Sequence, residues 1–276
     1  MGLYVYAVGS SSAGELPALQ GVLDQPAYRL DSGALCAIVS ECPIDTIRAE
    51  RRHIAAAQRV LAGFNAQFDL LPMAFGTVTK SEADLRNFLT EHHDVLTAQV
   101  KRVSGAVEMS LRLSLDVADP IAYLVERTPA LQAARERTFR RRRQPSYDDR
   151  IRLGQMFDDA LRRYRDVRTE QVVAVVGASC TEVIALPVRE EKEIANLALL
   201  VSRSGLDRFE AAVHASAEQI EEDIAFSIGG PWPPHNFVQF DPNGQSKAQP
   251  FVRGGRGHGH HRCSAGAAAA RSGLRS

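Results

Sequence analysis

The segment from Val107 to Val117 constrains the fold of this chain more than any other stretch. Over eleven positions, apolar residues alternate strictly with polar or charged ones: Val107, Met109, Leu111, Leu113, Leu115 and Val117 against Glu108, Ser110, Arg112, Ser114 and Asp116. A period of two residues sends successive side chains to opposite faces of a β-strand. The pattern therefore predicts a strand with one face in a core and the other in water, within a sheet covered on one side.

The sequence after this strand predicts a block of strand, helix, strand, strand, helix and strand. Asp119 followed by Pro120 is typical of a helix start, and helical sequence continues to about residue 167 with breaks near Pro129 and Pro145. The remaining predicted elements are apolar runs at 171–176, 183–188 and 194–202, an amphipathic helix at 205–221 capped by Ser204, and a strand at 223–228. With antiparallel pairing this order is a ferredoxin-like arrangement, and the helices at 129–167 are an insertion in its first crossover.

The first hundred residues predict a smaller α+β block. Its expected elements are buried strands at 3–8 and 34–39, a helix at about 45–63 capped by Asp45, an extended segment at 70–78, and a helix from Ser81 to about 99. Because Pro72 disfavours the helical conformation for Leu71, the segment 70–78 is expected to be extended. We therefore expect an α+β protein with two domains, residues 1–102 and 103–241, that meet near residues 100–106.

Composition excludes several classes of protein. A chain of 276 residues suits two modest domains, and it contains no apolar run near the roughly 20 residues that a membrane span needs. The four cysteines, Cys36, Cys42, Cys180 and Cys263, form no C-x-x-C pair or zinc spacing, and we interpret them as thiols in a reducing cytoplasm.

The charge is unevenly distributed, although the formal net charge is zero. Residues 242–276 carry basic residues and no acidic ones, and their Gly-, Ala-, Arg- and His-rich composition predicts a disordered tail. A basic arm on an acidic body predicts partners or self-association steered by charge. The Arg-rich stretch within the helical insertion lacks interleaved aromatic residues, so we do not expect nucleic acid as a partner.

No segment carries a recognisable catalytic, nucleotide or metal motif. His258, His260 and His261 are clustered, but without a scaffold such a metal site is adventitious. Gly177 to Cys180 is not a nucleophile motif and is better explained as a turn between two strands. We therefore expect no enzyme activity, no cofactor and no metal.

The only Trp of the chain lies in Gly230-Pro231-Trp232-Pro233-Pro234-His235-Asn236-Phe237. Three prolines fix φ and remove backbone donors, so this segment is expected to be stiff and extended. It formally contains P-x-x-P, a polyproline ligand pattern. Because a lone Trp is usually buried, we favour the interpretation that Trp232 covers the end of its own domain's core, with partner docking as the alternative.

This segment resembles the C-terminal signature of the gas vesicle protein F/L family. The opening run Leu3 to Val8 is similar to that family's first strand, and Leu70-Leu71-Pro72-Met73-Ala74-Phe75-Gly76-Thr77-Val78 is similar to its central motif. The resemblance covers roughly residues 1–240 in matching order. It implies an α+β N-terminal domain and a ferredoxin-like C-terminal domain enlarged by helices.

The resemblance also implies a function. It predicts a minor, non-enzymatic accessory protein of cytoplasmic gas vesicles that binds the hydrophobic shell protein during nucleation, prevents its aggregation, and works with other accessory proteins. The structural or docking candidates are Leu71, Pro72, Phe75, Gly230, Pro231, Trp232, Pro233, Pro234 and Phe237, with Arg140, Arg141, Arg142 and Arg143 as a basic surface. The alternative is a ligand-binding regulatory module, because ferredoxin-like domains host many small-molecule sensors.

Overall fold

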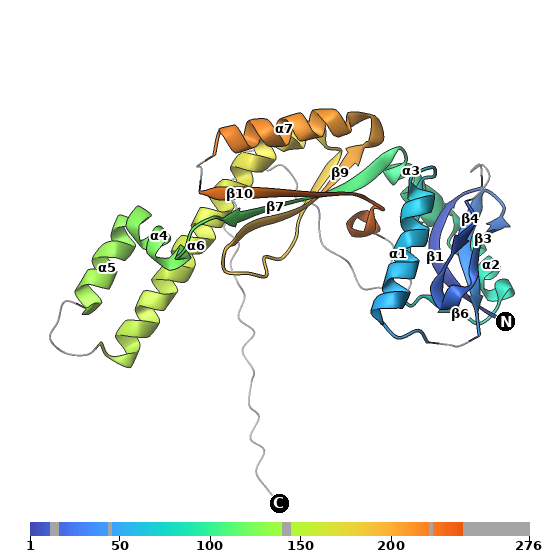
Figure 1. Cartoon of the computed structure of the whole chain (residues 1–276), viewed down its shortest axis with the longest axis horizontal. Coiled ribbons are helices and arrows are strands. Elements are labelled where there is room, and N and C mark those ends of the chain that lie inside the picture. Colours follow the sequence, from blue (N-terminus) through green and yellow to red (C-terminus); the bar gives the residue numbers. More distant parts are fainter. Residues whose placement is uncertain (12–16, 44–45, 140–144, 221–222, 240–276) are drawn as a thin grey trace, which may run out of the picture.

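The computed structural model describes residues 1–11, 17–43, 46–139, 145–220 and 223–239. Two separate antiparallel β-sheets lie along the molecule, the first at one end and the second in the middle, and a helical arm forms the other end (Figure 1). The predictions for Asp45, for Arg140 to Arg143 and for residues 242–276 fall outside the described residues.

The first sheet is built around β1 and has the order β2-β3-β4-β1-β5, with β6 also pairing with β1. Its strands are β1 (Gly2–Ser10), β2 (Leu19–Gln20), β3 (Pro26–Ser32), β4 (Leu35–Cys42), β5 (Leu70–Pro72) and β6 (Val78–Thr79). Helix α1 (Arg51–Asn65) packs on the face that carries Tyr4 and Tyr6. Helices α2 (Glu82–Glu91) and α3 (His93–Val103) pack on the face that carries Leu3 and Val5, so helices cover both faces.

Two details of this half differ from the sequence predictions. Helix α1 begins at Arg51 after Glu50, and not near Asp45, because Ile47 is buried in the non-helical segment before it. The helix expected from Ser81 to about 99 is interrupted at His92 and continues as α3. Its start is confirmed, because the Ser81 hydroxyl accepts a hydrogen bond from the Asp84 backbone N–H at 3.1 Å.

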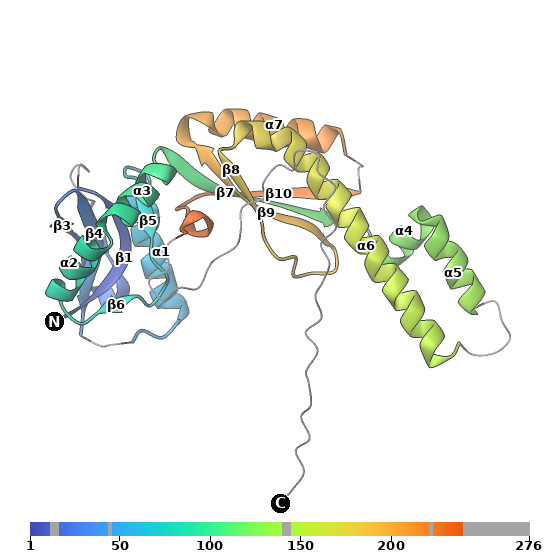
Figure 2. The same ribbon diagram turned by 180° about the vertical axis from the view of Figure 1, so that it is seen from behind.

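The second sheet has the order β10-β7-β9-β8 and is entirely antiparallel. Its strands are β7 (Ala106–Leu115), β8 (Glu182–Ala185), β9 (Glu193–Ser202) and β10 (Ile224–Trp232). Helices α6 (Tyr147–Val176) and α7 (Leu206–Glu218) lie on one of its faces, as Figures 1 and 2 both show. The alternating segment is confirmed as a strand, and its apolar residues from Val107 to Leu115 are buried against these helices.

The interpretation of the apolar run at 171–176 as a strand was wrong. These residues form the last turns of α6, where Val172, Val173 and Val176 recur at helical spacing and pack on the sheet. Gly177 to Ser179 is consequently a 3₁₀ turn between a helix and a strand, not a turn between two strands. Ser204 is not a helix cap either, because it lies in a 3₁₀ turn and its hydroxyl is 3.0 Å from that of Ser202.

A helical arm is inserted between β7 and the part of α6 that covers the sheet. It comprises α4 (Pro120–Arg127), α5 (Pro129–Phe139) and the first half of α6, and it projects away from the sheet (Figure 2). The Asp119 carboxylate accepts hydrogen bonds from the N–H groups of Ile121 and Ala122 at 2.9 Å, which confirms the predicted start of α4. Within the described parts of the chain, no helix combines the length and apolar character that a membrane crossing requires.

Candidate docking segment and the joint between the two sheets

A single apolar cluster extends from the first sheet to the second. Leu3, Val5 and the α3 residue Leu96 belong to it, and so do Ile184 and Leu200 of the second sheet. Phe237 and Val238, near the end of the described chain, complete it. The two halves are therefore packed together through buried side chains, and not only through the linking backbone.

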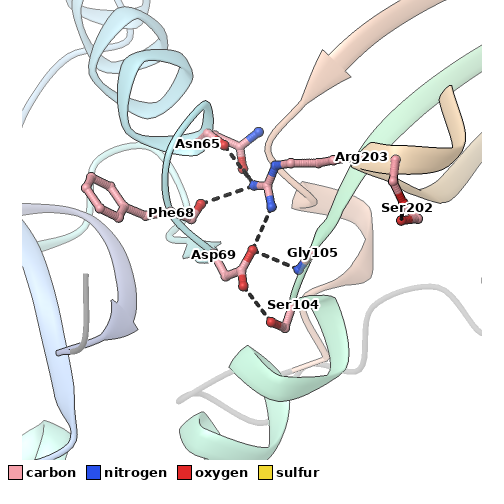
Figure 3. Close-up of polar contacts among 8 residues, drawn as sticks. Asn65, Phe68, Asp69, Ser104, Gly105, Ser202 and Arg203 are labelled. Carbon is pink, nitrogen blue, oxygen red and sulfur yellow. Dashed lines mark hydrogen bonds and ion pairs between the residues drawn. The ribbon is translucent and has the colours of Figure 1, made fainter. Parts of the chain in front are cut away.

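Polar contacts hold the same joint from another side, as Figure 3 shows. Arg203, directly after β9, donates to the Asp69 carboxylate at 2.6 Å and to the carbonyl oxygens of Asn65 at 2.8 Å and Phe68 at 3.2 Å. Asp69 also accepts hydrogen bonds from the Ser104 hydroxyl at 2.5 Å and the Gly105 N–H at 2.8 Å. The ion pair between Asp69 and Arg203 links the loop before β5 to the end of β9, and the hydrogen bonds to Asp69 link both to the turn between α3 and β7.

The electrostatics of Asp69 favour its ionised form. Burial alone raises the pKa of this carboxyl, but the hydrogen bonds from Ser104, Arg203 and Gly105, together with the charge of Arg203, outweigh it and leave the pKa lowered. The contribution of this group to stability is therefore present above the ordinary carboxyl pKa, and it is lost as pH falls through the lowered value.

The proline-rich segment turns from the edge of the second sheet into the joint. Residues His235–Phe237 form a 3₁₀ turn, and the side chain of Phe237 is 0% exposed. The Glu108 carboxylate accepts hydrogen bonds from the Asn236 backbone N–H at 2.8 Å and from its side-chain amide at 2.6 Å. The Arg102 guanidinium donates to the Phe237 carbonyl oxygen. Residues 233–239, which we name the strap, are thus anchored by both apolar and polar contacts.

Glu108 is a buried carboxylate on an otherwise polar face of β7. Burial raises its pKa, and the two hydrogen bonds from Asn236 act in the opposite direction without cancelling the effect of burial. The alternation of the sequence predicted that Glu108 faces water. Its burial is not visible in the sequence, because the strap that covers it is more than a hundred positions away in the chain.

Gly230 is required by the geometry of the bulge that precedes the strap. Its φ is +124°, and an added Cβ would lie 2.7 Å from the Met109 sulfur and 3.0 Å from the Glu108 carbonyl oxygen. We expect Gly230→Ala to lower the free energy of unfolding by about 1–3 kcal/mol, measured by chemical denaturation. Gly33→Ala is the matched control, because Gly33 also has a positive φ but an added Cβ would meet nothing within 4 Å. Equal losses in the two variants would contradict the role of the close contact.

The prediction that Trp232 is largely buried was wrong, since it is 50% exposed. After the bulge Trp232 pairs with Glu108, and paired residues of an antiparallel ladder share a face. That face is the one without α6 and α7. Pro233, Pro234 and Phe237 occupy the buried positions instead.

Half-exposure changes the expected effect of Trp232→Ala. We expect the free energy of unfolding to fall by only about 1–2 kcal/mol, because half of the indole surface is already in water. As the only Trp of the chain, Trp232 reports on its own surroundings by fluorescence, and acrylamide should quench it readily. Strong protection from quenching in the isolated protein would contradict this placement.

The other docking candidates are divided between core and surface. Leu71 and Pro72 are buried in β5, whereas Phe75 is 37% exposed and packs edge-on against Tyr4. Gly230 and Pro231 are exposed beside Trp232. Phe75 therefore belongs to the surface of the first sheet and Trp232 to that of the second.

The described residues offer little to nucleophilic or metal chemistry. Burial raises the pKa values of the Cys36 and Cys180 thiols to about 11, so both remain protonated near neutral pH. Among these residues no group of three or more His, Cys, Asp or Glu side chains is placed to hold a metal ion.

Comparison with known proteins identifies the relatives of this chain. The family model of the gas vesicle synthesis proteins GvpL/GvpF matches residues 2–239. Gas vesicle protein F of a Streptomyces species is 28% identical over 242 residues, which are 87% of this chain and 100% of that protein. Gas vesicle protein L1 of Halobacterium salinarum is 22% identical over 86% of this chain and 90% of its own length.

Solved structures agree in fold. Crystal structures of GvpF from Microcystis aeruginosa and from an Anabaena species superpose with TM-scores of 0.74 and 0.76, at 21% and 22% identity. Each comparison covers 87% of this chain and 99% of the other. Because the family model spans nearly all of the described residues, the chain belongs to the GvpL/GvpF family of gas vesicle synthesis proteins.

Proposed function

We propose that this protein is a non-enzymatic assembly factor that binds the hydrophobic shell protein of gas vesicles during nucleation and keeps it from aggregating. The observation that carries the proposal is the family match over residues 2–239. Membership of this family supports a role associated with gas vesicles, and the shell protein is the partner that most needs protection. An apolar subunit with an exposed strand or helix aggregates unless another surface covers it.

The proposal includes the organisation into two domains, residues 1–102 and 103–241, with a ferredoxin-like second domain. It is supported by the two separate sheets and by the order β10-β7-β9-β8, in which the chain runs strand, helices, strand, strand, helix and strand. The partner surface in this arrangement is the edge of the second sheet formed by β10, where Ile228 is 39% exposed.

A ligand-binding regulatory module is the alternative, and one observation favours it. A hollow of about 650 Å³ lies on the helical arm, lined by Val125, Glu126, Gln132, Arg135, Glu136 and Phe139. Its size falls within the roughly 300–1,000 Å³ that is usual for ligand sites. We favour the assembly role because the family match that supports it covers residues 2–239, whereas the hollow is lined by residues of the arm alone.

Co-purification tests the two functions against each other. If the protein is an assembly factor, we expect the tagged protein to retain the shell protein. High salt should weaken this binding only mildly, because surface ion pairs contribute about 0–1 kcal/mol each. Arg140→Glu combined with Arg141→Glu should change the association rate more than the affinity. Absence of co-purification at low salt, together with normal vesicles in a deletion strain, would overturn the assembly role. A thermal shift with a metabolite would then support the regulatory module.

A further inference from the structure

Strand β10 is an unusual edge strand, because it carries no charge. It lies at one edge of the second sheet, and its nine residues from Ile224 to Trp232 include no Asp, Glu, Lys or Arg. Natural sheet edges are usually protected by charged side chains, since an unprotected edge pairs with other chains. Ile228 on this strand is 39% exposed. Among the described residues of this strand, the bulge and Pro231 at its far end limit pairing.

The hydrogen-bond pattern shows which backbone groups face outward. The Asp116 N–H donates to the Asp223 carbonyl oxygen at 2.8 Å, in line with the register that pairs Ile224 with Leu115. Antiparallel pairs alternate between bonded and non-bonded positions. Phe226 and Ile228 therefore direct their N–H and C=O groups away from β7. Within the described residues, β7 is the only strand that pairs with β10.

The side chains of the same two residues define what an added strand would touch. Phe226 and Ile228 pair with Leu113 and Leu111, so they lie on the face covered by α6 and α7. Phe226 is partly buried against the core cluster of that face. A strand added beside β10 would place alternate apolar side chains next to Ile228 and extend this core.

The opposite edge of the sheet is less suited to strand addition. Strand β8 is four residues long and begins with Glu182. Arg102 lies 3.6 Å from the Glu182 carboxylate, so that end of β8 is occupied by a charged contact at the joint. Of the two edges of this sheet, β10 is the longer and the uncharged one.

A second copy of the chain is a poor match for this edge. Helix α7 covers the β10 side of the sheet, as both ribbon views show. Two copies paired through β10 about a two-fold axis would bring their α7 helices side by side. Among the exposed residues of α7, the acidic Asp207, Glu210 and Glu218 outnumber the basic Arg208, so a net excess of negative charge on each helix would oppose the pairing.

We propose that β10 is the surface that captures the hydrophobic shell protein, by adding an uncharged, apolar strand of that protein to the edge at Phe226 and Ile228. This assignment rests on the proposed assembly function and specifies its contact surface. Main-chain hydrogen bonds to Phe226 and Ile228 give the affinity, and the absence of charge on the edge selects a partner strand that is also uncharged.

Two substitutions at Ile228 test the assignment, with a control one residue away. Ile228→Pro removes an outward N–H while leaving the bonds to β7 intact, which is the position where an edge strand tolerates Pro. Ile228→Lys places a charge on the edge. Ser227→Lys adds the same charge on the uncovered face of the strand, because Ser227 pairs with Arg112. Each variant of the full chain is first checked for an unchanged thermal transition.

The measurement is retention of the shell protein on the immobilised variant. We expect both Ile228 variants to weaken retention at least about tenfold and Ser227→Lys to leave it nearly unchanged. If the unsubstituted protein retains the shell protein and the Ile228 variants do so equally well, the edge assignment is wrong while the assembly function stands. If the unsubstituted protein retains none, the proposed function itself fails. Stronger loss in Ser227→Lys, or a dimer that Ile228→Lys dissociates, would also overturn the assignment, in favour of the uncovered face or of a second copy.

Discussion

Phe237→Ala is expected to lower the free energy of unfolding by about 3–5 kcal/mol, the largest effect of any single substitution considered for this protein. The side chain is fully buried in the apolar cluster that the two sheets share. Its removal leaves a cavity at the joint and loosens the strap, which Glu108 and Arg102 hold through hydrogen bonds to Asn236 and Phe237. Chemical denaturation followed by circular dichroism measures the loss.

Phe139→Ala provides the matched control for this substitution. Phe139 lies at the end of α5 and is 58% exposed, so the same truncation should cost about 1 kcal/mol or less there. A loss for Phe237→Ala no greater than that for Phe139→Ala would show that the strap does not contribute to the stability of the joint.

Arg203→Ala is expected to lower the free energy of unfolding by about 2–4 kcal/mol. The substitution removes the donor to Asp69 and to two backbone carbonyl oxygens, and it leaves a partly buried carboxylate without its ion-pair partner. Combining it with Asp69→Ala in a double-mutant cycle isolates the pair, and we expect a coupling energy of about 1–2 kcal/mol.

An exposed ion pair supplies the comparison. Arg162 and Asp158 lie 3.5 Å apart on the surface of α6, and Arg162→Ala should cost about 0.5 kcal/mol or less. Because the pKa of Asp69 is lowered, the difference between the native protein and Arg203→Ala should shrink as pH falls through that lowered value. A difference independent of pH, or additive single substitutions, would contradict the ion pair at the joint.

The sequence predicted those elements whose signals are local. The alternation from Val107 to Leu115 identified β7, and Asp119 followed by Pro120 identified the start of α4. Ser81 marked the start of α2 for the same reason, because the capping hydrogen bond joins residues only three positions apart. In each case the physical cause lies within the segment itself.

The wrong predictions concern segments whose environment decides between two structures. The run 171–176 is rich in Val, which favours strands, yet it continues α6 because helical spacing places Val172 and Val176 on the sheet. Trp232 was expected in the core because a lone Trp is usually buried. The bulge after Gly229 turns it to the uncovered face, and Phe237 fills the core position five residues later.

The polar residues of the joint were not recognised from the sequence, although Leu71 and Phe237 of its apolar cluster were among the structural candidates. Arg203 and Asp69 are 134 positions apart, and Asn236 and Glu108 are 128 apart. Each is an ordinary polar residue in its own segment, so its role arises only when the two sheets pack together. Two signals in the sequence pointed to this region: the Gly-Pro-Trp-Pro-Pro motif before the strap, and the predicted meeting of the two domains near residues 100–106, which contain Ser104 and Gly105.

Aggregation of the shell protein, followed by light scattering after dilution from denaturant, shows whether this protein binds the shell protein and keeps it soluble. We expect the purified protein to delay the rise in scattering at ratios up to one molecule per shell subunit, and we expect Ile228→Lys to shorten this delay while Ser227→Lys does not. Unchanged aggregation at an equal ratio, under conditions in which the protein remains folded, would contradict the claim that it binds the shell protein and keeps it from aggregating.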